Sequence, residues 1–161
     1  MAEQRNVQKA DIPNPLLAKV KAGPESGFDF AAADNVILEL AKEFEARLPE
    51  ELEKIEAAYK AVKETPEDEE LRNALFRLVH DLKGQAGTFD YNLITVVGND
   101  LCRFLERRVQ MTGRRLQVVG FFIEGMGLVA KRGIKGDGGE FGMKLINTLH
   151  GMTQKVLQET D

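Results

Sequence analysis

Hydrophobic residues recur every three or four positions along most of this chain, which is the spacing of one buried face of an α-helix. The first run starts at Asp34, a residue type that often caps helices, and we expect a long helix kinked near Pro49. Its apolar positions are Val36, Ile37, Leu40, Phe44, Leu48, Leu52, Ile55 and Tyr59. Pro and Gly interrupt residues 1–33, where we expect a flexible N-terminal tail with Phe28 and Phe30 able to fold back onto the domain.

A second helix is predicted to start with Thr65 as its N-cap and Pro66 at its first helical position. Its apolar stripe is Leu71, Leu75, Leu78, Val79, Leu82, Ala86 and Phe89. A break at residues 90–92 leads into a third helix, which we expect Gly113 to end. The inward positions of that helix are Leu93, Val97, Leu101, Phe104, Leu105 and Val109.

Residues 114–132 are apolar on more than one side, so they predict a well-buried helix. A strand over residues 118–123 is the alternative, because this stretch is rich in β-branched and aromatic residues. A glycine-rich loop at residues 135–139 precedes a last helix. The apolar stripe of the last helix is Phe141, Leu145, Leu149, Met152 and Val156. Long amphipathic helices with short connections indicate an all-α, antiparallel bundle.

Composition and charge argue against some classes of function. The length of 161 residues fits one globular domain, and a net charge of -4 argues against general nucleic-acid binding. The charge is uneven, because residues 1–70 hold 9 basic and 17 acidic residues, whereas residues 71–161 hold 13 and 9. A single cysteine, no signal-peptide pattern and no apolar run near the ~18 residues of a membrane span predict a cytoplasmic protein without membrane contact.

The second predicted helix carries an exposed histidine. On a helical wheel, His80 lies opposite the apolar stripe, together with Asn73, Phe76, Arg77, Lys83, Gly84 and Gly87. Each glycine costs about 1 kcal/mol relative to Ala in a helix interior, so a glycine surface beside His80 indicates close approach by another molecule. A neutral imidazole is nucleophilic, and Lys83 can bring an ammonium group near whatever it carries.

The segment from His80 to Phe89, HDLKGQAGTF, with Leu93 and the Leu101 to Glu106 stretch after it, resembles the histidine-containing phosphotransfer (HPt) domain of multistep phosphorelays. The long C-terminal portion, with its loop at residues 135–139, resembles free-standing bacterial versions of that domain. The resemblance implies an up-and-down four-helix bundle with one additional helix, an HPt-like domain over residues 34–161. It also implies that His80 accepts a phosphoryl group on Nε2, that Lys83 stabilises the phosphoryl oxygens and that Gly84 leaves room for a partner. The family often has glycine where this chain has Asp90, a change that we expect to affect only the turn.

The resemblance further implies a phosphoryl carrier rather than an enzyme. Its partners would be response-regulator receiver domains and a hybrid histidine kinase, and the receiver would supply the Mg²⁺ that phosphoryl transfer needs. We expect no cofactor or metal site in this chain, and we expect a monomer. The residues predicted to contact a receiver are Phe76, Arg77, Gln85 and Gly87, with Arg103 or Arg107 adding positive charge.

Other interpretations remain. A helical module that binds a receiver or kinase without being phosphorylated would share the fold. A nucleotide-dependent enzyme would need a phosphate loop, and the G-x-G-x-x-A match at residues 125–130 lacks the rest of a βαβ unit. His150 is not followed by the Leu-Lys-Gly sequence that follows His80, so it is interpreted as a surface residue. Cys102 is interpreted as a packing residue.

Overall fold

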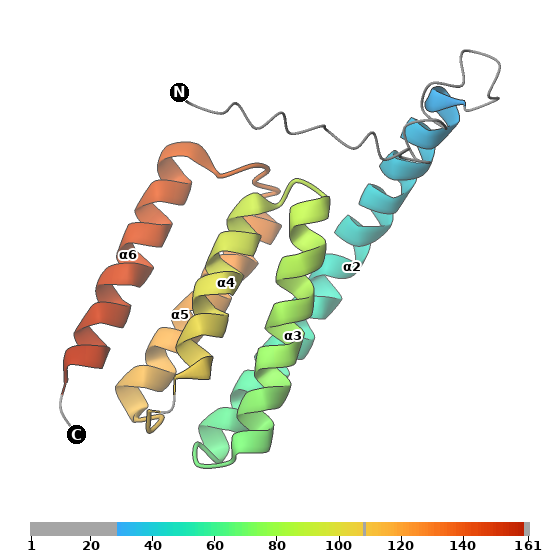
Figure 1. The fold of residues 1–161 in the computed structure, drawn as a ribbon. Coiled ribbons are helices and arrows are strands. Elements are labelled where there is room, and N and C mark those ends of the chain that lie inside the picture. The colour runs from blue at the N-terminus through green and yellow to red at the C-terminus, as the bar shows by residue number, and fades with distance from the viewer. Residues whose placement is uncertain (1–28, 108, 160–161) are drawn as a thin grey trace, which may run out of the picture. The chain divides into compact units, whose positions relative to one another are not determined.

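The computed structural model describes residues 29–107 and 109–159, which form five helices and no strand. They are α2 (Phe30–Glu64), α3 (Glu69–Thr88), α4 (Asn92–Glu106), α5 (Gly113–Lys131) and α6 (Gly139–Gln158). Successive helices run in opposite directions (Figure 1). The all-α antiparallel bundle with an additional helix is therefore confirmed, and the alternative of a strand over residues 118–123 is wrong.

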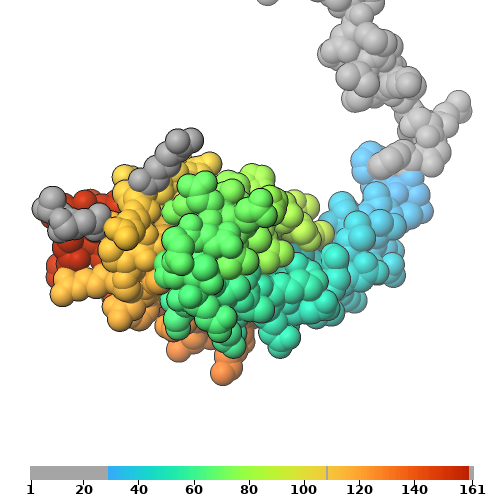
Figure 2. Space-filling model, turned by 90° about the horizontal axis from the view of Figure 1, so that it is seen from below, coloured from blue at the N-terminus to red at the C-terminus, as the bar shows by residue number. Residues whose placement is uncertain are grey.

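The chain divides between Ile37 and Leu38, and residues 38–159 contain the hydrophobic core. Within this unit α3 packs against α4, and α2 packs against α5, where the Tyr59 hydroxyl donates a hydrogen bond to Leu116 O at 2.8 Å. The additional helix α6 lies on the far side of the α4–α5 pair (Figures 1 and 2). The core consists of apolar side chains from all five helices, including Leu149 and Val156 of α6. The bulkiest fully buried ones are Phe44, Ile55, Leu75, Leu82, Leu93, Ile94, Leu101, Phe104, Phe122 and Met126.

The first helix begins earlier than the sequence predicts. The Asp29 carboxylate accepts hydrogen bonds from the backbone amides of Ala31 and Ala32, so Asp29 caps the helix and Asp34 lies inside it. The helix continues through Pro49 without interruption. Three of its predicted apolar positions, Val36, Ile37 and Leu40, are exposed, and its buried side chains begin at Phe44. Phe30 is an exposed residue of the helix, and Phe28 lies outside the described residues.

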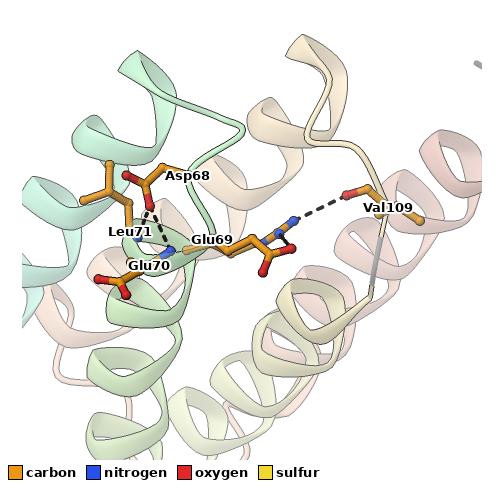
Figure 3. Close-up of polar contacts among 6 residues, drawn as sticks. Asp68, Glu69, Glu70, Leu71 and Val109 are labelled. Atoms are coloured by element: carbon orange, nitrogen blue, oxygen red, sulfur yellow. Dashed lines mark hydrogen bonds and ion pairs between the residues drawn. The ribbon is translucent and has the colours of Figure 1, made fainter.

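The start of α3 also differs from the prediction. Asp68, not Thr65, is the N-cap, because its carboxylate accepts hydrogen bonds from the amides of Glu70 and Leu71 (Figure 3). Thr65 and Pro66 belong instead to the turn after α2, which the hydrogen bond from Asp68 N to Thr65 O closes at 3.1 Å. A carboxylate three residues further along therefore provides the cap.

The third helix ends at Glu106, seven residues before the predicted end at Gly113, and Gly113 instead begins α5. Val109 consequently lies in the connection, where it is half-buried. The predicted break between α3 and α4 is confirmed. Asp90 has a φ of 64°, the left-handed conformation that favours glycine and tolerates Asp. The expectation that Asp90 affects only the turn agrees with this backbone.

The additional helix α6 packs on α4 and α5. Gly125 of α5 lies so close to Leu145 that a β-carbon would be 3.2 Å from the leucine side chain. The loop before α6 contacts the α3–α4 turn, because Gly136 N donates to Asp90 O at 2.7 Å and Leu93 N donates to Gly136 O at 2.9 Å. No helix in the described part of the chain is both long enough and apolar enough to cross a membrane.

Candidate functional site

His80 lies on the exposed side of α3, eight residues before the helix ends at Thr88. Its imidazole stacks on the ring of Phe76, one turn earlier, with centroids 5.8 Å apart and planes inclined by 27°. Asp81 places a carboxylate oxygen 3.7 Å from Nδ1, beyond hydrogen-bond distance but close enough for electrostatic attraction. None of the described residues hydrogen bonds to Nε2, and the His80 side chain is 57% exposed.

Lys83, one turn after His80, is half-buried and held by α4. Its ammonium donates a hydrogen bond to Asn99 Oδ1 at 3.0 Å. The Thr95 hydroxyl donates to the Lys83 carbonyl oxygen at 2.9 Å. A β-carbon at Gly98 would lie 3.0 Å from the Lys83 β-carbon, so the glycine permits the close approach of α4 to α3 here. The site therefore includes part of α4.

The two glycines near His80 have different surroundings. A β-carbon at Gly84 would meet no atom within 4 Å, so packing within the described chain does not require glycine there. A β-carbon at Gly87 would lie 3.1 Å from the Thr95 hydroxyl oxygen, so Gly87 already has a close neighbour on α4. Both glycines are exposed, but only at Gly84 is the missing side chain unexplained by internal contacts.

The other predicted contact residues lie at the protein surface. Arg77 and Gln85 are exposed on α3, and Phe76 is half-buried beneath the His80 ring. Arg103 is exposed on α4, with Asp100 3.9 Å away, and Arg107 is exposed at the end of that helix. The helix thus presents Phe76, His80 and Lys83 at one-turn intervals, as the wheel predicts, and the roles assigned to these residues stay predictions.

The wheel did not find Asn99, Thr95 or Asp81. Asn99 and Thr95 are on a different helix from His80, so no periodicity within α3 can reveal them. The available signal was the pair of polar residues four positions apart on a mainly apolar helix, which places both on one face. Asp81 follows His80 directly, but its proximity to Nδ1 depends on side-chain conformation.

Two other candidate nucleophiles among the described residues, His150 and Cys102, are hydrogen-bonded or buried. His150 Nε2 lies 2.8 Å from Asp100 Oδ2, a hydrogen bond that joins α6 to α4. Cys102 is buried, and burial is the main cause that raises the pKa of its thiol from 9.0 to about 11, with Lys83 opposing the shift. The G-x-G-x-x-A stretch lies inside α5. No group of three or more His, Cys, Asp or Glu side chains in the described residues is arranged to hold a metal ion.

Comparison with known proteins assigns the family. The model of the Hpt domain matches residues 39–128, which is more than half of the chain and includes His80, Lys83 and Asn99. The match ends within α5, so α6 lies outside it. No curated protein and no solved structure matches the chain significantly. Hpt domains are histidine phosphotransfer modules of phosphorelays that interact with receiver domains and kinases, and this chain belongs to the Hpt domain family.

Proposed function

We propose that the protein carries a phosphoryl group on Nε2 of His80 between the aspartates of receiver domains, in a multistep phosphorelay of the bacterial cytoplasm. The observation that carries this proposal is an exposed imidazole with an unbonded Nε2 inside a matched Hpt domain. The family match supports the phosphotransfer role, and the geometry at His80 supports the choice of atom.

The surroundings of His80 favour the reactive tautomer. The negative charge of Asp81 near Nδ1 favours a proton on that nitrogen, which leaves the lone pair of the neutral ring on Nε2. The lone pair forms a bond to phosphorus while the bond from phosphorus to the aspartyl oxygen of the receiver breaks. The electron pair of the broken bond returns to the aspartate, and Nδ1 keeps its proton. The reverse sequence passes the group to a second receiver.

Charge stabilisation is divided between the two proteins. Lys83 offers one ammonium, whereas phosphoryl transfer also needs cations on the equatorial oxygens and an in-line acceptor. Asp81 supplies a single carboxylate at the site and no ligand cluster accompanies it in the described residues, so the donor set does not fit Mg²⁺ binding by this chain alone. We therefore assign Mg²⁺ to the receiver partner.

The receiver would dock on the exposed side of α3. Gly84 supports this surface, because its missing side chain leaves open space that no described residue fills. Arg77, Gln85 and Lys83 offer polar contacts, and Phe76 and Gly87 offer apolar ones. Positive charge from Arg77 and Lys83 suits an acidic receiver site. A hybrid histidine kinase with its own receiver is the proposed source of the phosphoryl group.

A phosphotransfer assay tests the proposal. The full chain is incubated with phosphorylated receiver domains and Mg²⁺, and label that is lost in acid but stable in base is measured on this chain. The wild type is expected to become labelled and His80→Gln to remain unlabelled. Undiminished labelling of His80→Gln would show that another residue accepts the group. Receiver binding without any labelling would instead favour the non-phosphorylated interaction module.

A further inference from the structure

The hydrogen bond between the Lys83 ammonium and Asn99 is of a kind that a more negative acceptor can replace. An ammonium group bonded to a neutral amide oxygen at 3.0 Å is held by one hydrogen bond, without the attraction of a full negative charge. Both side chains are half-buried where α3 meets α4. Asn99 is therefore placed to set where the Lys83 ammonium lies while keeping it available to a stronger anion.

The rest of Lys83 is fixed by the same helix. The Thr95 hydroxyl bonds the Lys83 carbonyl oxygen, and the Gly98 backbone lies against the Lys83 β-carbon. These contacts hold the start of the side chain, whereas Asn99 holds its end. Movement of the ammonium between acceptors therefore requires only rotation of the intervening methylene groups, with no displacement of either helix.

We propose that Asn99 is a positioning residue for phosphoryl transfer: its amide oxygen holds the Lys83 ammonium in the unphosphorylated protein and yields it to the phosphoryl oxygens when His80 is modified. This inference rests on the proposed function of His80. A phosphoryl group carries negative charge, so it attracts the ammonium more strongly than a neutral amide does.

The proposed role requires a neutral amide side chain at position 99. An aspartate at position 99 would form an ion pair with Lys83 and would also repel an incoming phosphoryl group. An alanine would remove the acceptor and leave the ammonium without a defined position. We expect both substitutions to slow phosphoryl transfer, and aspartate to slow it more than alanine.

The test uses the full chain with phosphoramidate, a small phosphoryl donor that transfers its group to imidazole and releases ammonia. Rates of His80 phosphorylation are compared for wild type, Asn99→Gln, Asn99→Ala and Asn99→Asp. We expect Asn99→Gln to approach the wild-type rate, Asn99→Ala to be several-fold slower and Asn99→Asp slower still. Asn147→Asp is the matched control, because it adds the same charge at an exposed position on α6 and should leave the rate unchanged.

A double-substitution cycle separates positioning from a general structural effect. If Asn99 acts through Lys83, Asn99→Ala should slow phosphorylation in the wild-type background and have no further effect in a Lys83→Met background. Equal slowing in both backgrounds would overturn the inference, and so would an Asn99→Ala rate equal to that of the wild type. Both results leave the proposed function intact. Failure of wild-type His80 to become phosphorylated would overturn the proposed function as well.

Discussion

The two histidines of this chain are exposed to nearly the same extent but differ in their bonding. The side chain of His80 is 57% exposed and that of His150 is 52% exposed. Nε2 of His150 is bonded to Asp100, whereas the same atom of His80 has no hydrogen-bond partner among the residues described. Exposure alone therefore does not distinguish a phosphoacceptor from a surface residue.

The neighbours of the two rings extend this contrast. His80 is followed by Lys83 and Gly84, which offer an ammonium and open space, whereas Gly151, Met152 and Thr153 follow His150. A carboxylate bonded to Nε2 of His150 favours a proton on that atom, which removes its nucleophilic lone pair. His150 also lies outside the matched Hpt region. Its bond to Asp100 indicates a structural role in fastening α6 to α4.

The largest predicted effect tests whether the hydrogen bond to Asp100 alone explains why His150 differs from His80 as a phosphoacceptor. We expect the double variant His80→Gln, Asp100→Asn to take up no acid-labile label from a phosphorylated receiver, because the freed His150 still lacks a neighbouring Lys and an adjacent glycine. His150→Gln, the matched single variant, should be labelled as fully as the wild type. Label on the double variant would show that a free ring nitrogen is sufficient.

A second prediction concerns Cys102, the third potential nucleophile. Because burial raises the pKa of its thiol from 9.0 to about 11, the folded protein holds far less thiolate at pH 9 than the unfolded chain does. With these pKa values the thiolate fraction at pH 9 is about one half in the unfolded chain and about 1% in the folded protein, so alkylation by iodoacetamide should slow roughly 50-fold or more. Alkylation rates with and without denaturant measure the effect, and equal rates would contradict the burial of Cys102.

The same shift gives a pH dependence of stability with a defined sign. The folded state binds the thiol proton more tightly than the unfolded state, so this contribution is fully present below pH 9. It should decline as the pH rises from 9 to about 11. Denaturant unfolding of wild type and Cys102→Ala over this range measures the difference, and the steeper decline is expected for the wild type.

A third prediction compares two exposed helical glycines. Gly84 and Gly151 both have open space where a β-carbon would lie, so Ala at either position should raise the free energy of unfolding by about 0.5–1 kcal/mol. Only Gly84→Ala should slow phosphoryl transfer from a receiver, by several-fold, because only Gly84 lies on the proposed docking surface. Unchanged transfer by the folded Gly84→Ala variant would remove Gly84 from that surface.

The smallest predicted effect concerns the His150 contact itself. Asp100→Asn should lower the free energy of unfolding by no more than about 1 kcal/mol, because the pair is partly exposed to solvent. The same change in a His150→Gln background should have less effect, which a double-mutant cycle by urea denaturation can measure. A coupling energy of zero would contradict the fastening role of this pair.

Much of the fold follows from hydrophobic periodicity, whereas the helix ends depend on which of several nearby residues caps the helix. All five helices were predicted, but two starts were wrong because several residues competed as caps. Asp29 and Asp34 are the same residue type five positions apart, and the positions of their side chains decide which one bonds the free backbone amides. Asp68 similarly replaced Thr65. The predicted end at Gly113 was wrong because glycine can occupy either end of a helix.

The site was predictable only where it lies on a single helix. Periodicity placed His80 and Lys83 on one exposed side of α3, because one helix fixes their relation. Asn99 was missed because its contact with Lys83 depends on how α4 packs against α3, which Gly98 permits. Gly87 shows the same limitation, since its close neighbour Thr95 belongs to α4. Contacts between helices therefore determine the details that the sequence pattern leaves open.

The most direct test of the central claim is the identity of the phosphorylated atom. The full chain, labelled with ¹⁵N in its histidine rings, is phosphorylated by a receiver domain and studied by ³¹P and ¹⁵N NMR spectroscopy. We predict one phosphoramidate signal, coupled to Nε2 of His80, with the ring signals of His150 unchanged. A phosphoryl group on Nδ1 of His80, on His150 or on an oxygen atom would contradict the account.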